Sequence, residues 1–255
     1  MTVGLRAAWR LLRCVLHALH GLGVVLFRFG TLDAAGRHAR IRWWSAKMLR
    51  VLGVGIQVDG AVRPGGALLV ANHVSWLDIT ALHAVVPQAR FVSKADIQSW
   101  PLLSRLADAA DTLYLQRERK RDALRVVHLV AQALSERQTV AVFPEGTTSD
   151  GRTLLPFHAN LLQPAIATDT PVQPVALRFS DAHERISRAV EFVGATTLAE
   201  SLWRVACAER LVAHVALLPA RACTHADRRA LAQTLRADIE AALQPTLEPD
   251  VKPAS

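Results

Sequence analysis

The chain has 255 residues, of which 51% are hydrophobic, and its formal net charge is +8. The length allows one sizeable α/β domain, or one domain with an appendage. The basic balance and the positive mean hydropathy of +0.20 favour anionic partners, and they point to a membrane surface more than to nucleic acid, whose binders are usually less apolar. Three scattered cysteines without C-x-x-C spacing argue against a disulfide scaffold or a zinc site and fit a reducing compartment.

The first 53 residues predict a pair of membrane-associated helices. The stretch from Leu11 to Phe27 is mostly apolar, but Arg13, His17 and His20 interrupt it, so it falls short of the roughly 20 apolar residues of a clean membrane span. A basic start before an apolar stretch also resembles a signal peptide, but no convincing small-x-small cleavage site follows. The pattern therefore favours an amphipathic helix that lies in, or dips into, the bilayer.

A second cationic helix is predicted from about His38 to Val51. Trp43 and Trp44 lie there among arginine and lysine residues, which is typical of a helix at the level of lipid headgroups. The alternative interpretation is a surface helix that packs on the rest of the domain.

Short apolar runs alternate with helical stretches after Gly55. Strands are predicted at 67–71, up to 92, at 112–116, 139–143 and 172–179, and helices at 76–86 and 121–134. This alternation predicts an α/β fold with a mixed sheet flanked by helices, to which the N-terminal membrane-associated helical pair is attached. Pro174 suggests that the strand containing it is an edge strand or an irregular one.

One more helix is predicted near the C-terminus. Thr224 and Asp227 form a start that resembles a capping box, and Pro245 ends the helix. Its apolar face is Leu231, Leu235, Ile239 and Leu243. The expected organisation is an N-terminal helical segment over 1–53, an α/β domain over 54–220, and a C-terminal helix with a frayed tail over 221–255.

The segment Asn72-His73-Val74-Ser75-Trp76-Leu77-Asp78 follows a predicted strand and opens a predicted helix, which is where open α/β sheets place their ligand sites. His73 is suited to accept a proton near neutral pH. Asp78 could fold back to bond the other ring nitrogen and fix the tautomer. Alternatively, Ser75 caps the helix with Asp78 as its N3 partner, and His73 is an ordinary turn residue. For a His and an Asp alone at this spacing, the structural alternative is favoured.

A second segment, Phe143-Pro144-Glu145-Gly146-Thr147-Thr148-Ser149, follows another predicted strand. Backbone amides around Gly146, with Thr147 and Thr148, could cradle a phosphate, although Pro-Glu-Gly also suits an ordinary β-turn. Glu145 is unexpected beside an anion and would fit better if it held a hydroxyl or positioned an arginine.

Two cations end neighbouring predicted strands. Arg117 closes the segment Tyr114-Leu115-Gln116-Arg117, and Lys94 follows the strand that contains Phe91. Both could reach a phosphate at the same sheet edge. The alternative, favoured for each residue in isolation, is a solvated surface charge.

Together these segments resemble the glycerolipid acyltransferase family typified by bacterial 1-acylglycerol-3-phosphate acyltransferase. The family blocks N-H-x-x-x-x-D and F-P-E-G-T are matched by residues 72–78 and 143–147, and a Pro-containing apolar strand is echoed at 171–175. The block G-x-x-F-I-x-R is matched by Tyr114, Leu115 and Arg117, but Asp111 stands where it usually has Gly. That departure would add a carboxylate near the presumed phosphate site. The run 143–151 also looks like the bacterial branch that acylates lyso-ornithine lipid.

The resemblance implies transfer of a fatty acyl group to the sn-2 hydroxyl of 1-acylglycerol-3-phosphate, which gives phosphatidic acid. His73 would be the general base and Asp78 would orient it. The residues implied in substrate binding are Asn72, Ser75, Lys94, Arg117, Glu145, Gly146 and Thr147. A thioester of coenzyme A or of acyl carrier protein would be the co-substrate, and neither a metal nor a redox cofactor is implied.

The implied partners are membrane lipids, the lysophospholipid acceptor and the acyl donor, at the cytoplasmic face of the bacterial inner membrane. One alternative is acylation of another lyso-lipid, with lyso-ornithine lipid first. An alternative of another class is a basic membrane- or nucleic-acid-binding protein without catalysis. No recognised nucleic-acid motif is present in the sequence, so nucleic acid is not an expected partner.

Overall fold

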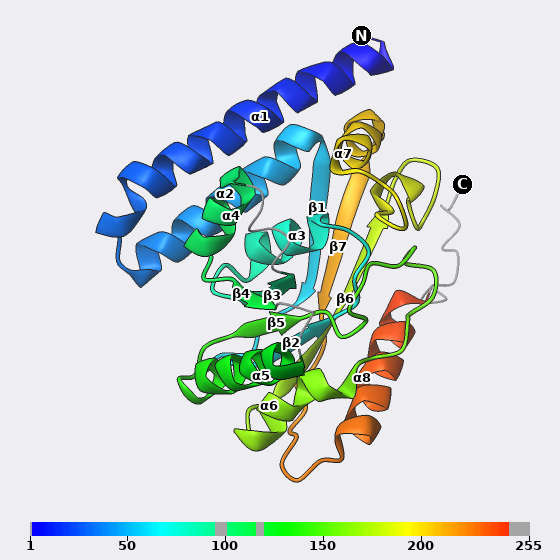
Figure 1. Ribbon diagram of the computed structural model, residues 1–255. Helices are drawn as coiled ribbons and strands as arrows, with labels where there is room; N and C mark the ends of the chain where they lie inside the picture. The colour runs from blue at the N-terminus through cyan, green and yellow to red at the C-terminus, as the bar shows by residue number, and fades with distance from the viewer. Residues whose placement is uncertain (1, 95–100, 116–119, 245–255) are drawn as a thin grey trace, which may run out of the picture.

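The fold is a single mixed sheet covered by helices on both faces (Figure 1). The computed structural model describes residues 2–94, 101–115 and 120–244. Within these residues seven strands pair in the order β1-β7-β6-β2-β5-β3-β4. The only antiparallel pair among them is β6 with β7, so the predicted α/β fold with a mixed sheet is confirmed. The strands are β1 (Val54–Gly60), β2 (Leu68–Ala71), β3 (Arg90–Lys94), β4 (Leu113–Leu115), β5 (Val140–Val142), β6 (Val172–Ser180) and β7 (Leu211–Leu217).

Helices cover the two faces of the sheet and create two hydrophobic clusters. The alternation of side chains along β2 shows the division: Leu69 and Ala71 join one cluster, and Leu68 and Val70 join the other. The first cluster lies under the helices α2 (Ala34–Leu52), α3 (Leu77–Val85) and α7 (Leu198–Cys207). The second lies under α5 (Lys120–Ser135), α6 (Gln163–Ala167) and α8 (Arg228–Leu243). The remaining elements are α1 (Val3–Phe27), α4 (Pro101–Ala109) and the 3-10 turns η1 (Phe29–Thr31), η3 (Ala159–Leu162) and η4 (Arg188–Val190).

Pro174 lies in an interior strand, so the edge-strand alternative is wrong and the irregular one is right. The carbonyl of Pro174 accepts a hydrogen bond from the N–H of Leu218 on the side of β7, and the ring nitrogen faces the same side. On that side the pairing shifts by one residue between the bridge of Val172 with Arg221 and the ladder that starts at Val175 with Leu217. The missing N–H of proline therefore falls at an interruption of the ladder, where it costs no strand hydrogen bond.

The helix α8 forms as predicted, but its start differs in detail. Asp227 is itself the N-cap, because its carboxylate accepts hydrogen bonds from the N–H groups of Arg229 and Ala230, both at 2.9 Å. The hydroxyl of Thr224 bonds Asp169 instead, so the predicted capping box is wrong.

The N-terminal pair is two long helices joined by a short turn. Asp33 caps α2 by accepting a 2.8 Å hydrogen bond from the N–H of Gly36. Gly53 ends α2 with φ of 82°, a left-handed conformation that glycine adopts without strain. His17 and Trp44 hold the two helices together, because a ring nitrogen of each is bonded to the other's carbonyl oxygen, at 2.9 and 3.3 Å.

Both expectations for α2 apply to different sides of the helix. Met48, Leu49 and Leu52 are buried against the domain, as the surface-helix alternative required. Trp43 is exposed and carries Lys47 over its ring, 4.7 Å from the ring centroid, as expected of a helix at headgroup level.

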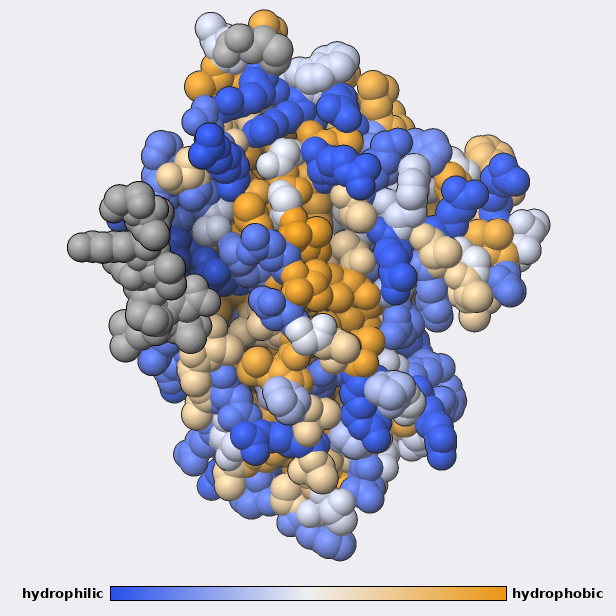
Figure 2. All heavy atoms as spheres, turned by 180° about the vertical axis from the view of Figure 1, so that it is seen from behind, coloured by the Kyte–Doolittle hydropathy of each residue, from blue (hydrophilic) through white to orange (hydrophobic). Residues whose placement is uncertain are grey.

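The helix α1 exposes most of its apolar side chains, and this suggests membrane association. By length and composition it could cross a membrane, but it lies along α2 and reaches α7 (Figure 1). Figure 2 shows a further band of apolar side chains across the face turned away from the viewer in Figure 1. The exposed large apolar residues of α1 are Val3, Leu5, Trp9, Leu12, Val15, Leu16, Leu19, Leu26 and Phe27.

Two arginines connect α1 to the C-terminal end of α7. One guanidinium nitrogen of Arg10 donates 2.9 Å hydrogen bonds to the carbonyls of both Ala206 and Ala208, at the C-terminal end of α7. Arg6 donates to the carbonyl of Cys207 at 3.2 Å and to Glu209 at 2.8 Å. A cation at this end of a helix also interacts favourably with the helix dipole.

The net positive charge of the protein comes from this pair of helices. Residues 1–53 contain nine of the 30 Lys and Arg residues but only one of the 22 Asp and Glu residues. This segment therefore carries the whole formal excess of +8, and residues 54–255 are balanced. The electrostatic attraction to anionic lipid headgroups would therefore act mainly on the helical pair, because the sheet domain carries no net charge.

Candidate active site

The site lies where β2 and β5 end. These strands are parallel neighbours, so the segments that follow them leave the sheet at the same edge. His73 comes two residues after β2 ends, and Glu145 comes three residues after β5 ends. The fold thus brings together the two most distinctive segments of the sequence.

Asp78 holds the imidazole of His73. Its Oδ2 lies 2.7 Å from the Nδ1 of His73 and accepts further hydrogen bonds from the N–H groups of Val74 and Ser75, at 2.7 and 2.9 Å. The predicted orienting role and the predicted role at the helix start are therefore performed by one oxygen. Asp78 is fully buried, and its Oδ1 is sealed without a partner among the described residues.

This geometry prepares His73 to act as a base. A carboxylate can only accept, so the proton of a neutral imidazole lies on Nδ1 and the lone pair lies on Nε2. Within the described residues no hydrogen bond engages Nε2, and the side chain of His73 is 18% exposed. A hydroxyl that reaches Nε2 could therefore give up its proton there.

The second segment fixes the ring and backbone of His73. The ring of Phe143 stacks on the imidazole at 4.0 Å with 12° between the planes. Oε1 of Glu145 accepts from the N–H of His73 at 2.7 Å, and Ser149 donates to the carbonyl of His73 through its N–H at 2.8 Å and its hydroxyl at 3.2 Å. Phe143 and Ser149 were visible in the sequence as parts of this segment, but their contact with His73 was not.

Glu145 supports the backbone of the site through both of its carboxylate oxygens. It is 4% exposed, and its Oε2 accepts a 2.9 Å hydrogen bond from the N–H of Leu155. Burial raises the pKa of Glu145, while the hydrogen bonds from Leu155 and His73 act in the opposite direction. Both oxygens are thus engaged with the backbone, and contact of Glu145 with substrate stays a prediction.

Asn72 and Ser75 also support the backbone, and their predicted substrate contacts stay predictions. The amide of Asn72 exchanges two hydrogen bonds with the backbone of Leu177, at 2.8 and 2.7 Å, and so extends the pairing of β2 with β6 by one step. Ser75 is fully buried, and its hydroxyl accepts from the N–H of Leu77 at 3.4 Å. Both side chains fix the path of the chain around His73.

Gly146 and Thr147 remain candidates for substrate contact. Gly146 has φ of 70°, and its N–H donates to the carbonyl of Phe143 at 3.0 Å, which closes a turn. Thr147 is exposed on that turn. The hydroxyl of the next residue, Thr148, is engaged with the carbonyl of Phe192.

The predicted cations cannot be placed. Arg117 lies outside the described residues, and so does the side chain of Lys94. In the part of the chain that the structure describes, no group of three or more His, Cys, Asp or Glu side chains could hold a metal ion.

Asp111 does not add a carboxylate to the site, and that expectation is wrong. It precedes β4 and so lies at the opposite edge of the sheet from His73. Its φ is 52°, a left-handed conformation in which Gly is favoured and Asp is tolerated. The family's Gly at this position is therefore a requirement of the backbone, and Asp111 meets it.

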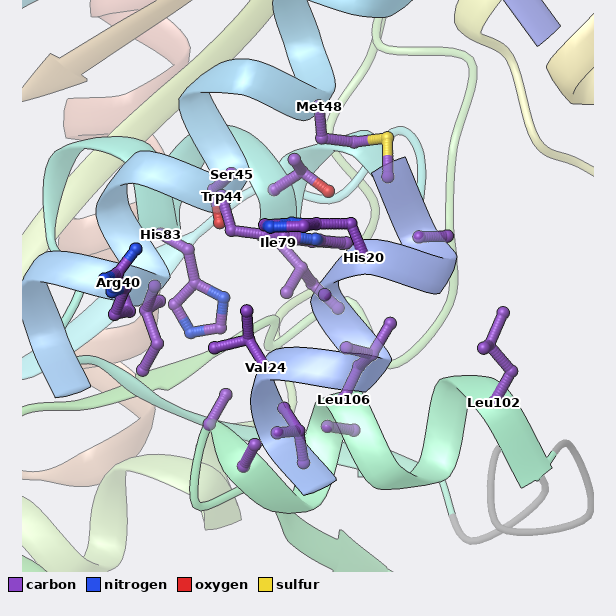
Figure 3. Close-up of a pocket in the computed structure, with 18 of the residues that line it drawn as sticks. His20, Val24, Arg40, Trp44, Ser45, Met48, Ile79, His83, Leu102 and Leu106 are labelled. Carbon is purple, nitrogen blue, oxygen red and sulfur yellow. The ribbon is translucent and has the colours of Figure 1, made fainter. Parts of the chain in front are cut away.

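An apolar cavity of about 720 Å³ lies among α1, α2, α3, α4 and α7 (Figure 3). Phe91 lines it and stacks on Phe143 at 5.8 Å, so the cavity adjoins the rings that support His73. Trp76, three residues after His73, lines it as well. The volume is within the usual range of small-molecule sites, about 300–1,000 Å³.

His83, in the wall of this cavity, is expected to make the fold acid-sensitive. Burial lowers its pKa from 6.5 to about 4. Between these values the unfolded chain binds a proton that the folded chain does not, so stability falls as the pH falls, by about 3 kcal/mol in total. In detergent, the thermal midpoint of the wild type should therefore drop more between pH 7 and pH 4.5 than that of His83→Phe.

The control is His128→Gln, which replaces an exposed histidine and should follow the wild-type profile. Parallel profiles for wild type and His83→Phe would show that His83 titrates normally in the folded protein.

Comparison with known proteins identifies relatives. The sequence profile of the family described as "Acyltransferase" matches residues 55–178. A lyso-ornithine lipid O-acyltransferase of Pseudomonas aeruginosa is 34% identical over 213 residues, which cover 84% of this chain and 81% of that protein. A 1-acyl-sn-glycerol-3-phosphate acyltransferase of Neisseria meningitidis serogroup B is 36% identical over 197 residues, which cover 76% of each.

One solved structure is similar over nearly the whole fold. It is the 1-acyl-sn-glycerophosphate (LPA) acyltransferase PlsC from Thermotoga maritima, with a TM-score of 0.67 over 92% of this chain and 96% of that one. At 18% sequence identity, this likeness concerns the fold alone.

Proposed function

The chain belongs to the acyltransferase family, and on that premise we propose that it moves a fatty acyl group from a thioester to the sn-2 hydroxyl of 1-acylglycerol-3-phosphate, giving phosphatidic acid. The acceptor is a lyso-lipid, as the names of the relatives indicate. The observation that carries the proposal is the pair of His73 and Asp78, bonded at 2.7 Å with Nε2 accessible. The hydrogen bonds of Glu145 and Ser149 with the backbone of His73 hold this pair at the edge of the sheet.

In this reaction, the hydroxyl of the acceptor approaches Nε2 of His73. The imidazole takes the proton as the hydroxyl oxygen attacks the thioester carbonyl, and a tetrahedral oxyanion forms. Its collapse breaks the C–S bond, and the imidazolium returns the proton to the departing sulfur, so an ester and a free thiol result. Asp78 stabilises the imidazolium meanwhile. The scheme needs no metal or redox cofactor, since base, nucleophile and leaving group complete it.

The contacts assigned to substrate come from the turn after β5 and from the two predicted cations. Gly146 and Thr147 would meet the acceptor headgroup, with Lys94 and Arg117 as the cations that bind its phosphate. The acyl donor would be a thioester of coenzyme A or of acyl carrier protein. The apolar cavity beside Phe91 would receive a fatty chain.

The protein would work at the cytoplasmic face of the bacterial inner membrane. Support comes from the exposed apolar side of α1 and from the confinement of the excess positive charge to residues 1–53. Apolar burial and attraction to anionic headgroups act together in such helices. The lysolipid acceptor would lie in that leaflet, so the site and this substrate would share one surface.

A second candidate acceptor is lyso-ornithine lipid. The relative from Pseudomonas aeruginosa that carries this name covers more of the chain than the Neisseria protein, 84% against 76%. The same base and the same attack on a thioester would serve, with a different headgroup contact. A non-catalytic membrane- or nucleic-acid-binding role lacks support of this kind.

The test is an acyl-transfer assay in vesicles that offers both acceptors side by side, each with acyl-CoA and with acyl carrier protein thioester. We expect the larger kcat/KM for 1-acylglycerol-3-phosphate, by at least about tenfold, which corresponds to about 1.4 kcal/mol of discrimination. The reverse ratio would establish lyso-ornithine lipid as the acceptor. No product from any combination would overturn both candidates.

A further inference from the structure

Two buried polar side chains interrupt the apolar wall of the cavity. Among the described residues that line it, the only buried polar ones are Ser45 of α2, which is 1% exposed, and His83 of α3, which is 7% exposed. Figure 3 shows both side chains on the same side of the cavity, close to Trp44 and Ile79. A polar group in such a place needs a hydrogen-bond partner or costs free energy.

The protonation of His83 follows from its one hydrogen bond. Its Nε2 lies 3.1 Å from the carbonyl oxygen of Ala89, and a carbonyl only accepts, so Nε2 carries the proton. Burial keeps the ring neutral by lowering its pKa to about 4. Nδ1 is then a bare acceptor, and its ring packs edge-to-face on Phe91 at 4.7 Å.

Both groups face the cavity and are not sealed in the protein. Among the described residues, two side-chain polar atoms are inaccessible to solvent and have no hydrogen-bond partner. They are Nε of Arg6 and Oδ1 of Asp78. Neither His83 Nδ1 nor Ser45 Oγ is one of these, and no hydrogen bond to either is found among the described residues. Each therefore keeps open space beside it, and the cavity supplies that space.

We propose that the cavity binds a hydroxylated acyl chain, whose hydroxyl donates to Nδ1 of His83 and bonds the hydroxyl of Ser45. This deepens the proposed function and rests on it. A hydroxyl is the smallest group that can donate to a bare nitrogen and also accept from a serine. A ketone has no proton to donate, and a charged group would lose its hydration in an apolar cavity.

The hydroxyl could belong to the chain of the donor or to the chain of the acceptor, and the experiment separates the two. Donor thioesters of equal length are compared with and without one hydroxyl, which is moved stepwise along the chain. The same series is made in the acyl chain of the lysolipid. The quantity measured is the ratio of kcat/KM for the hydroxylated and plain members of each pair.

We expect the wild type to prefer the hydroxylated member at one position of one of the two chains, by roughly two- to tenfold, as for one net hydrogen bond. Ser45→Ala and His83→Phe should each bring that ratio toward one. Ile79→Val is the matched control, since it trims the same wall without touching a polar atom and should keep the wild-type ratio.

A second measurement does not depend on turnover. Plain and hydroxylated free fatty acids of equal length are compared by their stabilisation of the wild type against heat, and the same preference is expected. If the wild type fails to discriminate in both measurements, an ordered water satisfies the two groups and the proposal is overturned. A preference that survives in both variants overturns it too. Absence of all transfer with the binding preference intact would instead overturn the proposed function alone.

Discussion

Replacement of His73 by alanine is expected to lower kcat for acyl transfer by about 10²–10⁴-fold, the usual contribution of a positioned general base. The ring is lost, but the hydrogen bonds that Glu145 and Ser149 make to this residue go to its backbone. The fold should therefore survive, apart from the stacking on Phe143. The measurement is single-turnover transfer in vesicles, together with the thermal midpoint.

The matched control is His158→Ala, because His158 is exposed and follows the second segment. It should keep nearly full activity. If His73→Ala turned over at the wild-type rate, His73 would not be the base, although membership of the family would stand.

The change Asp78→Asn is expected to lower kcat by a similar factor, about 10²–10⁴-fold, for a different reason. An asparagine oxygen could still accept from the N–H groups of Val74 and Ser75, as Oδ2 does now. The same oxygen could also keep its hydrogen bond with Nδ1 of His73, but a neutral amide does not stabilise the imidazolium as a carboxylate does. The helix start and the ring tautomer would persist, while the negative charge that stabilises the protonated base would be lost.

The expected signature is thus a large fall in kcat with a smaller change in the thermal midpoint. Asp59→Asn, a change of an exposed carboxylate on β1, is the control and should do neither. A loss of activity that only follows unfolding would reduce Asp78 to a helix-capping residue.

The candidate site could be predicted from the sequence because its two central residues lie close together along the chain. His73 and Asp78 are close enough along the chain to meet within one strand-to-helix turn, and each of the two interpretations of Asp78 described one of its hydrogen bonds. The supports were harder to see, because they join distant parts of the chain. Asn72 bonds Leu177, and nothing in the local pattern around either residue indicates the other.

Other errors came from reading a local signal without its place in the sheet. Asp111 was interpreted by its charge, whereas its backbone conformation is what the position requires. The strand β1 was missed because it is an exposed edge with only Val54 buried, so it lacks an apolar pattern. The strand β7 was missed as well, although its sequence has the alternation of a strand. Every second residue is buried, namely Leu211, Ala213, Val215 and Leu217.

The hydrogen bonds of Arg6 and Arg10 to the end of α7 limit how the enzyme can be oriented at a bilayer. An upright crossing would separate both guanidinium groups from the end of α7 and break the hydrogen bonds that they make there. A helix lying flat keeps these bonds and still buries its leucines. The sheet domain would then keep a fixed depth and a fixed orientation relative to the bilayer. A lipid that diffuses within the leaflet would therefore always approach His73 from the same direction.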